Sequence, residues 1–348
     1  MSLFEHKEFD QHEQVVFCHD KATGLKAIIA IHDTTMGPAL GGTRLWNYAS
    51  SSEALTDVLR LSRGMTYKSA ISGLPLGGGK AVIIGDAKQI KSAELFRAYG
   101  RFVNSLSGRY ITAEDVNIRT SDIAIVAEET NFVAGTEGKA GDPSPHTALG
   151  TYLGLKIAAK HRLGSEDLSG VKIAVQGLGA VGYAFAEYLA KDGAELFVTD
   201  INEEAVNKAV NELGATAVGL DDIYGLDVDI YAPCALGATI NDDTLQQLKA
   251  KVIAGSANNQ LATPKHDQLV KDQGILYAPD YVINAGGVIH ICSEAANFTV
   301  EETEKRVRGI YDTLDNVFTR AAEQNRPTGE IADAMAREII ANEKKKKA

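Results

Sequence analysis

The sequence predicts an α/β protein of two domains, the second of which is a Rossmann-type, doubly wound parallel sheet. Three observations predict this class. Strand-like and helix-like segments alternate along most of the 348 residues, as they do in sheets covered by helices. A stretch with three glycines and two prolines, residues 135–145, interrupts that alternation. The G-x-G-x-x-G motif at 177–182 lies between a predicted strand and a predicted helix, where dinucleotide-binding sheets carry it.

The first half of the chain contains short apolar runs rich in β-branched residues, separated by segments with helical periodicity. Helices begin well at serine, so Ser51 or Ser52 is the expected N-cap of the first long helix. The expected strands are 15–18, 25–31, 40–46, 81–84 and 110–112, and the expected helices are 51–71, 92–106 and 121–130.

The second half begins at the glycine- and proline-rich stretch 135–145, which cannot form regular structure and is expected to be the interdomain hinge. After it, regular strand and helix alternation predicts a parallel sheet. The expected domains are 1–135, with about 327–348 folding back on it, and 136–326. The expected elements are a helix at 147–161, strands at 171–175, 196–199, 230–232, 252–254 and 275–277 with helices between them, and a helical segment at 300–341 broken at Pro327.

Composition excludes several functional classes. The net charge is -11, from 35 Lys and Arg against 46 Asp and Glu, which argues against nucleic acid or an anionic membrane as a partner. No segment has the length and apolarity of a signal peptide or a membrane span, so we expect a cytoplasmic protein. Three scattered cysteines and histidines without ligand spacing predict no disulfide framework and no metal. The lysine run at 344–347 is expected to be a frayed, solvated helix end.

Two lysines, Lys68 and Lys80, flank a triple glycine at 77–79. Helical periodicity puts Lys68 near the inward side of its helix, and Lys80 opens an apolar strand. Burial and mutual repulsion would lower a lysine pKa and make it usable as a base. The glycines would let a carboxylate-bearing substrate approach the backbone, although a glycine-rich loop before a strand is often only a turn.

The motif Gly177-Leu178-Gly179-Ala180-Val181-Gly182 predicts a cofactor site. Its glycines allow a tight turn and let a pyrophosphate lie at the helix N-terminus, where free amides favour an anion. Asp200 follows the next strand, where a carboxylate accepts hydrogen bonds from the adenosine ribose. Asp200 would repel a 2′-phosphate and no cation follows before Lys208, so the expected cofactor is NAD.

Four segments carry a family resemblance: residues 37–44 (GPALGGTR), 76–80 (LGGGK), 112–115 (TAED) and 284–288 (NAGGV). With these segments in this order, the sequence resembles the glutamate, leucine, phenylalanine and valine dehydrogenases over essentially its whole length. Within that family it is most similar to the leucine-specific members. The resemblance implies an N-terminal substrate-binding and oligomerisation domain, separated by a cleft from the NAD-binding domain.

The resemblance also implies residue roles. Lys68 would pair with the substrate α-carboxylate, helped by the backbone of Gly41 and Gly42. Lys80 would be the general base and acid, and Asp115 would exchange a proton with the amino group. Oxidative deamination needs such a cationic clamp and two proton carriers. The other matching positions are Leu40, Met65, Ala113, Val288 and Ile291 at the substrate, and Thr147, Asn259 and Asn284 near the nicotinamide.

Specificity is expected from Leu40, which stands where glutamate-specific enzymes carry a lysine for the side-chain carboxylate. An apolar pocket favours branched-chain amino acids, and one methylene is worth only ~1–3 kcal/mol of discrimination. The expected reaction is reversible, NAD-dependent deamination of leucine and other branched-chain L-amino acids to 2-oxo acids by a homo-oligomer, an octamer by resemblance. The alternatives are a phenylalanine or valine enzyme of this family, or a non-catalytic dinucleotide-responsive protein, which would not need Lys68, Lys80 and Asp115 together.

Overall fold

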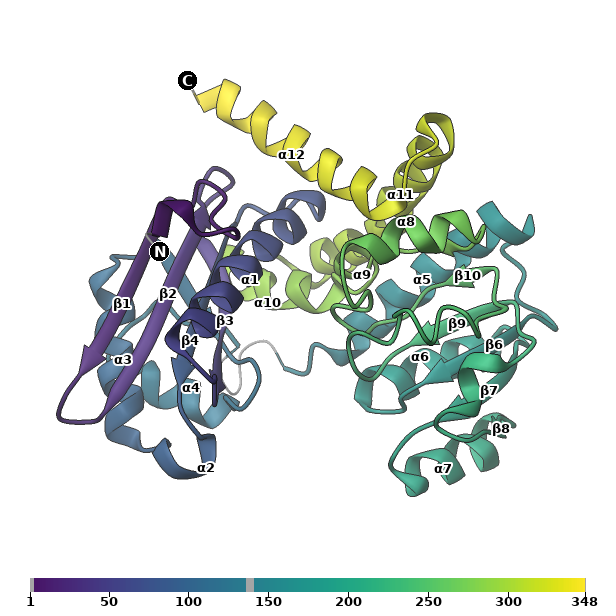
Figure 1. Cartoon of the computed structure of the whole chain (residues 1–348), viewed down its shortest axis with the longest axis horizontal. Coiled ribbons are helices and arrows are strands. Elements are labelled where there is room, and N and C mark those ends of the chain that lie inside the picture. The colour runs from purple at the N-terminus through teal and green to yellow at the C-terminus, as the bar shows by residue number, and fades with distance from the viewer. Residues whose placement is uncertain (1–2, 136–140, 348) are drawn as a thin grey trace. The chain divides into compact units, whose positions relative to one another are not determined.

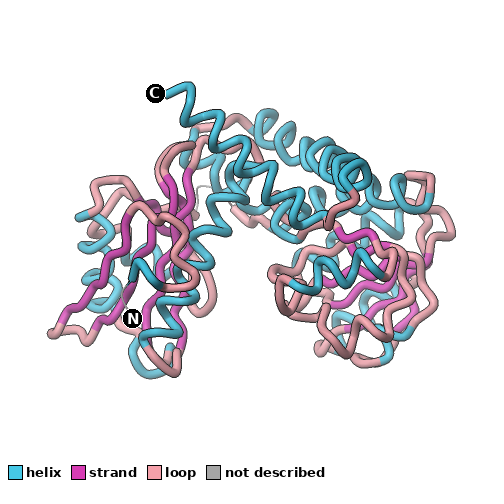
Figure 2. The backbone as a smooth tube through the Cα atoms, turned by 45° about the horizontal axis from the view of Figure 1, so that its top comes forward, coloured by secondary structure: helices cyan, strands magenta, loops and turns pink. Residues whose placement is uncertain are grey.

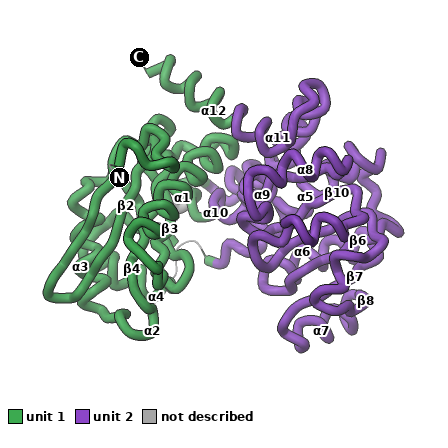
Figure 3. Tube along the Cα trace, in the orientation of Figure 1, with its two compact units in different colours: residues 1–141, 291–298, 336–348 green, residues 142–290, 299–335 purple. Residues whose placement is uncertain are grey.

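The computed structural model describes residues 3–135 and 141–347, and it divides into two compact units (Figure 3). Unit 1 comprises Met1–Gly141, Ile291–Phe298 and Ala336–Ala348, and unit 2 comprises Asp142–His290 and Thr299–Met335. Each unit contains its own sheet, so the predicted two-domain α/β class is confirmed. Residues 136–140 of the predicted hinge lie outside the described residues, and the predicted domain limits stay a prediction.

Unit 1 is built on a mixed five-stranded sheet in the order β1-β2-β4-β3-β5. The first three strands in this order pair antiparallel, and β3 runs parallel to both β4 and β5. The strands are β1 (Gln14–Asp20), β2 (Leu25–Asp33), β3 (Ala39–Trp46), β4 (Gly77–Ile84) and β5 (Tyr110–Ala113), and the helical segments up to residue 126 are η1 (Leu3–Glu5), α1 (Ser51–Ile71), α2 (Ala87–Ile90), α3 (Ala93–Ser105) and α4 (Thr120–Val126).

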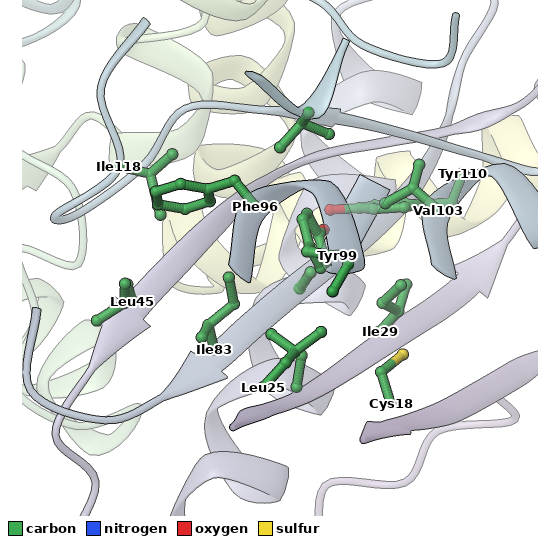
Figure 4. Packing of buried hydrophobic residues seen from close by; sticks show 14 of the residues in the cluster. Cys18, Leu25, Ile29, Leu45, Ile83, Phe96, Tyr99, Val103, Tyr110 and Ile118 are labelled. Carbon is green, nitrogen blue, oxygen red and sulfur yellow. The ribbon is translucent and has the colours of Figure 1, made fainter. Parts of the chain in front are cut away.

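Helices α1 and α3 cover opposite faces of this sheet (Figure 1). Successive strand residues face opposite sides, and the two apolar clusters follow that alternation. Ile29 and Ile83 pack with Phe96 and Tyr99 of α3 (Figure 4), whereas Ile28, Ala30 and Val82 pack with Val58 and Leu59 of α1. Even-numbered residues of β4, Lys80 among them, therefore face the α1 side.

Unit 2 contains a parallel six-stranded sheet in the order β11-β10-β9-β6-β7-β8, with helices around it (Figure 2). This is the doubly wound order: successive strands are added on one side of β6 up to β8, and from β9 onward they are added on its other side. The strands are β6 (Lys172–Gln176), β7 (Glu195–Thr199), β8 (Thr216–Ala217), β9 (Ile230–Pro233), β10 (Val252–Ile253) and β11 (Leu276–Tyr277). The helical segments are α5 (Ser144–Leu163), α6 (Ala180–Lys191), α7 (Glu203–Leu213), η2 (Asp222–Gly225), α8 (Lys265–Asp272), α9 (Asp280–Ile283) and α11 (Val300–Gln324). Helix α10 (Gly286–Ala296) begins in unit 2 and ends in unit 1.

The C-terminal helix α12 (Thr328–Lys347) follows a break at Asn325, which adopts a left-handed conformation, and Pro327. The predicted break is therefore confirmed. The lysines at 344–347 are exposed and helical, as expected of a solvated helix end. The expected fraying is wrong, because the helix continues to Lys347 and Lys344 Nζ lies 2.9 Å from Asp33 Oδ2. Among the described helices, none is long and apolar enough to cross a membrane.

The N-cap of α1 is another small correction. Ser50, one residue before the predicted Ser51 or Ser52, accepts a hydrogen bond from the Glu53 amide through its hydroxyl. Three serines in a row satisfy the same sequence rule, and only the backbone conformation selects among them.

Candidate active site

The candidate catalytic residues of unit 1 lie on the face of the sheet that α1 covers. Lys80 is the fourth residue of β4, not its first, and it pairs in register with Ala30 of β2. Arg44 of β3 pairs with Val82, which places it on the same side. Asp115 follows β5, and its Cβ lies 2.9 Å from where a Cβ on Gly42 would be.

A chain of alternating charges connects these residues. Lys80 Nζ lies 3.2 Å from Asp115 Oδ2, and Arg44 Nε donates to the same oxygen at 2.9 Å. Arg44 Nη1 also donates to Asp57 Oδ2 at 3.0 Å, and that oxygen accepts the Tyr48 hydroxyl at 2.8 Å. Asp57 lies on α1, so the helix fixes the guanidinium that in turn fixes Asp115.

Burial sets the protonation behaviour of this pair. Desolvation lowers the pKa of Lys80, with Arg44 lowering it further and Asp115 opposing the shift. Burial alone would raise the pKa of Asp115, but the charges of Lys80 and Arg44 outweigh it and hold that pKa below its usual value. The expected lowering of the Lys80 pKa by desolvation is confirmed. The positive charge that lowers this pKa further is that of Arg44.

The interpretation of the triple glycine as room for a substrate is wrong. Gly77, Gly78 and Gly79 are the first residues of β4, and the protein itself fills the space beside them. A Cβ on Gly78 would lie 2.0 Å from the Thr66 nitrogen of α1, and one on Gly79 would lie 2.7 Å from the Tyr110 ring. Gly78 therefore allows α1 and the sheet to approach each other closely, and Gly79 leaves room for the Tyr110 ring.

Four predicted substrate-binding residues are neighbours on β3 and β5. The two strands pair in parallel, with Gly42 opposite Ala113 and Leu40 opposite Ile111. Leu40 and Ala113 are buried, and by strand alternation they face the same side as Lys80. The Gly41 carbonyl accepts the Tyr110 hydroxyl at 2.6 Å, which positions the backbone at the glycine pair.

The other two predicted substrate-binding residues of unit 1 lie on α1. Met65 and Lys68 are three residues apart and half-buried, on either side of Thr66, which packs against Gly78. This contact places the last turns of α1 over the start of β4. Lys68 and Lys80 are thus carried by two elements that are packed directly together.

In unit 2, the loop after β6 has the geometry that a dinucleotide requires. Gly177 has φ 104°, and a Cβ on Gly182 would lie 2.1 Å from the Gly177 carbonyl oxygen. Gly179 is the exposed N-cap of α6, which begins at Ala180 and Val181, and nothing lies within 4 Å of a Cβ built on it. The N-terminus of α6 is therefore open to an anion.

Asp200 supports this loop directly. Its Oδ2 accepts the Leu178 amide at 2.6 Å and its Oδ1 accepts the Asn202 amide at 2.8 Å. A Cβ on Gly177 would lie 2.7 Å from Ala235 Cβ, just beyond β9. The loop thus lies where the order of the parallel strands reverses, which is where ligands bind in open α/β sheets.

The predicted nicotinamide-side residues gather at the start of α5 and around Asn284. Asn284 is buried and donates to Asn258 Oδ1 at 2.7 Å and to the Ser256 carbonyl at 3.1 Å. A Cβ on Gly287 would lie 2.8 Å from Thr147 Oγ1. Asn259 has φ 53° and its carbonyl accepts the Ala238 amide at 2.7 Å.

Val288 and Ile291 lie three residues apart on α10, at the point where the chain passes from unit 2 to unit 1. Their assignment to a substrate pocket stays a prediction. The same holds for the roles assigned to each residue above.

Sequence reasoning missed Arg44, Asp57 and Tyr48. Arg44 is the last residue of the segment 37–44, and it lies in a predicted strand between two buried residues. A charged residue in such a strand is the pattern that could have identified it. Its partners lie 13 and 71 positions away along the chain, so no local pattern identifies them.

The fold and the geometry of the two units define a dinucleotide-binding oxidoreductase. Residues 12–132 match the family model "Glu/Leu/Phe/Val dehydrogenase, dimerisation domain", and residues 197–347 match the model "Glutamate/Leucine/Phenylalanine/Valine dehydrogenase". The chain belongs to this family of amino-acid dehydrogenases, and it acts on small molecules.

Relatives with known names agree over almost the full length. Leucine dehydrogenase of Geobacillus stearothermophilus is 56% identical over 343 residues, which are 98% of this chain and 94% of that protein. Leucine dehydrogenase of Bacillus subtilis is 54% identical with the same coverage. The crystal structure of L-tryptophan dehydrogenase from Nostoc punctiforme superposes with a TM-score of 0.88 at 48% identity, covering 96% of this chain and 97% of that one. The predicted family, fold class and enzymatic character are confirmed.

Proposed function

We propose that this enzyme catalyses the reversible, NAD-dependent oxidative deamination of L-leucine and other branched-chain L-amino acids to 2-oxo acids and ammonia. The observation that carries the proposal is the buried pair of Lys80 and Asp115, in a chain whose relatives at 53–56% identity are leucine dehydrogenases.

The pair is suited to the two proton transfers of this reaction. A lysine whose pKa is lowered by burial can accept a proton from the attacking water, which gives the carbinolamine. After passing that proton on, it can accept the carbinolamine hydroxyl proton as the carbonyl forms and ammonia leaves, and it acts as the acid in the reverse reaction. Asp115 lies within proton-transfer distance of it and serves the amino group or the departing ammonia. Lys68 holds the substrate carboxylate. A nicotinamide cofactor bound at the glycine loop would supply the redox chemistry by accepting the hydride from Cα.

For the cofactor, we propose NAD over NADP. Asp200 presents a carboxylate beside the glycine loop, where it would accept hydrogen bonds from the ribose hydroxyls of NAD and would repel the 2′-phosphate of NADP. The residues that follow, 201–207, carry no lysine or arginine.

For the substrate, buried Leu40 and Ala113 provide no charge to compensate a second carboxylate, which disfavours glutamate. L-tryptophan and valine dehydrogenases are 50% and 47% identical to this chain, so the choice of side chain needs direct measurement. We further propose a homo-oligomer, supported by the dimerisation-domain match, with eight chains as the expected number in light scattering.

The test is a steady-state panel of leucine, isoleucine, valine, phenylalanine, tryptophan and glutamate, each with NAD and with NADP, at alkaline pH. We expect the highest kcat/KM with leucine and NAD, and similar values for isoleucine and valine. Faster turnover of tryptophan or of NADP would overturn the corresponding assignment, and no turnover of any amino acid would overturn the function.

A further inference from the structure

Unit 2 contains a cavity of about 400 Å³ that none of the predicted site residues lines. It is bounded by the end of α5, by α8 and β11, and by the junction of α11 and α12. Its apolar lining is formed by Val270, Ile275, Leu276, Phe318, Ala321 and Ala322. A cavity of this size accommodates a small organic molecule.

One acid lines the cavity, and within residues 3–135 and 141–347 it has no cationic partner. Asp267 on α8 is only 8% exposed, and its oxygens accept the Gly329 and Glu330 amides of α12 at 3.3 and 3.0 Å. In the described chain, no lysine, arginine or histidine nitrogen lies within 4.0 Å of it. Burial raises the pKa of Asp267 to about 6, assisted by the charges of Glu330 and Asp333 and opposed by the two amides. Near neutral pH the cavity thus holds a buried carboxylate that a cation would stabilise.

Three cations line the same cavity: Arg162, Lys271 and Arg326. Arg162 Nε donates to the Gly274 carbonyl at 3.1 Å. Within the described residues, neither Arg162 nor Lys271 forms an ion pair with a carboxylate. Arg326 lies 3.4 Å from Glu330. Lys271 follows Asp267 by one helical turn, yet the two side chains form no ion pair in the described structure.

This combination selects the chemistry of the ligand. A simple anion would satisfy the cations but be repelled by Asp267, and a simple amine would leave the cations unused. A molecule with both charges and an apolar remainder satisfies every part of the lining.

We propose that this cavity binds a free apolar amino acid at a second, non-catalytic site. Its ammonium group lies against Asp267, its carboxylate against Arg162 and Lys271, and its side chain against the apolar lining. The proposal does not depend on which amino acid the enzyme oxidises, because the cavity shares no residue with the proposed catalytic site.

The test is calorimetric titration of the full-length protein with L-leucine in a Lys68→Ala background, which weakens the proposed catalytic site. We expect about one leucine still to bind per chain. Adding Asp267→Asn, or adding Lys271→Gln, should weaken that binding at least tenfold. Adding Asp272→Asn, which removes an exposed carboxylate at the end of the same helix, should not change it.

Analogues separate the two charges. Isoamylamine lacks the carboxylate and 4-methyl-2-oxopentanoate lacks the ammonium group, so both should bind this site at least tenfold more weakly than leucine. The proposal fails if the Lys68→Ala protein binds no leucine, or if neither added substitution weakens binding. Because the Lys271 side chain has no hydrogen-bond or ion-pair partner among the described residues, Lys271→Gln tests the proposal if Asp267→Asn impairs folding. Failure of the proposed function would appear separately, as absent leucine-dependent NADH formation.

Discussion

Lys80 and Asp115 form an ion pair with 3.2 Å between Nζ and Oδ2, and their side chains are 8% and 23% exposed. Two proton carriers thus touch each other in a largely dry environment, while Arg44 holds the acid from its other side. Both proton transfers of the proposed reaction depend on this contact between Lys80 and Asp115.

Removing the lysine tests its role directly. Lys80→Ala should lower kcat for leucine oxidation by about 10²–10⁴-fold, the usual contribution of a positioned general base. Lys26→Ala, an exposed lysine on the adjacent strand β2, should leave kcat unchanged. Near wild-type turnover in Lys80→Ala would remove Lys80 from the mechanism.

The pH profile should respond to Arg44. Its positive charge lowers the pKa of Lys80 and of Asp115, so Arg44→Met should raise both. Because the base must be neutral to act, the acid limb of kcat should move to higher pH. Arg60→Gln removes the exposed guanidinium bound to the other oxygen of Asp57 and should move the limb less. A shift of the Arg44→Met limb to lower pH would contradict this account.

Glycine 78 should be intolerant of any side chain. Gly78→Ala places a Cβ 2.0 Å from the Thr66 backbone nitrogen, and such overpacking costs about 1–3 kcal/mol or more. The displaced α1 carries Lys68, so KM for leucine should also rise. Gly64→Ala on the same helix has open space and should stabilise by about 0.5–1 kcal/mol. Thermal unfolding of both variants checks the contrast, and equal melting temperatures would refute it.

The glycine loop can be tested without disturbing the fold. A Cβ at Gly179 meets no protein atom within 4 Å, but it would project into the space proposed for the pyrophosphate. Gly179→Ala should therefore keep the wild-type melting temperature and raise KM for NAD at least tenfold. Gly225→Ala, equally unobstructed, should change neither value. An unchanged KM in Gly179→Ala would place the pyrophosphate elsewhere.

The free energy of unfolding should depend on pH through the protonation of Asp267. Its folded pKa of about 6 exceeds the ordinary 3.8, so the folded state binds this proton more tightly than the unfolded state. Relative to Asp267→Asn, the wild type should gain stability as the pH falls from 7 to 4, by up to about 3 kcal/mol. Urea unfolding of both proteins across this range measures the difference. A difference that stays constant or grows in the other direction would contradict the raised pKa.

Much of the fold was predictable because local patterns determine it. Strand alternation, the serine-capped start of α1 and the motif at 177–182 are short-range signals. The network of Arg44, Asp57 and Asp115 was not predictable, because it joins β3, α1 and the segment after β5 through side chains distant in the chain. The prediction that the glycines of β4 leave room for a substrate failed for a related reason. A glycine in the sequence indicates that another group approaches the backbone closely, but it does not indicate whether that group is a ligand or part of the protein.

The contact between Gly78 and Thr66 also bears on the design of variant libraries. Helix α1 contributes three residues to this region. Asp57 orients Arg44, and Thr66 packs the helix against β4. Lys68 is proposed to bind the substrate carboxylate. Randomising residues 77–79 to enlarge the substrate pocket would mostly yield misfolded chains, because no free volume exists there. Libraries aimed at new side-chain preference should instead vary the proposed pocket positions Leu40, Ala113, Val288 and Ile291, and keep the residues that pack α1 against β4 unchanged.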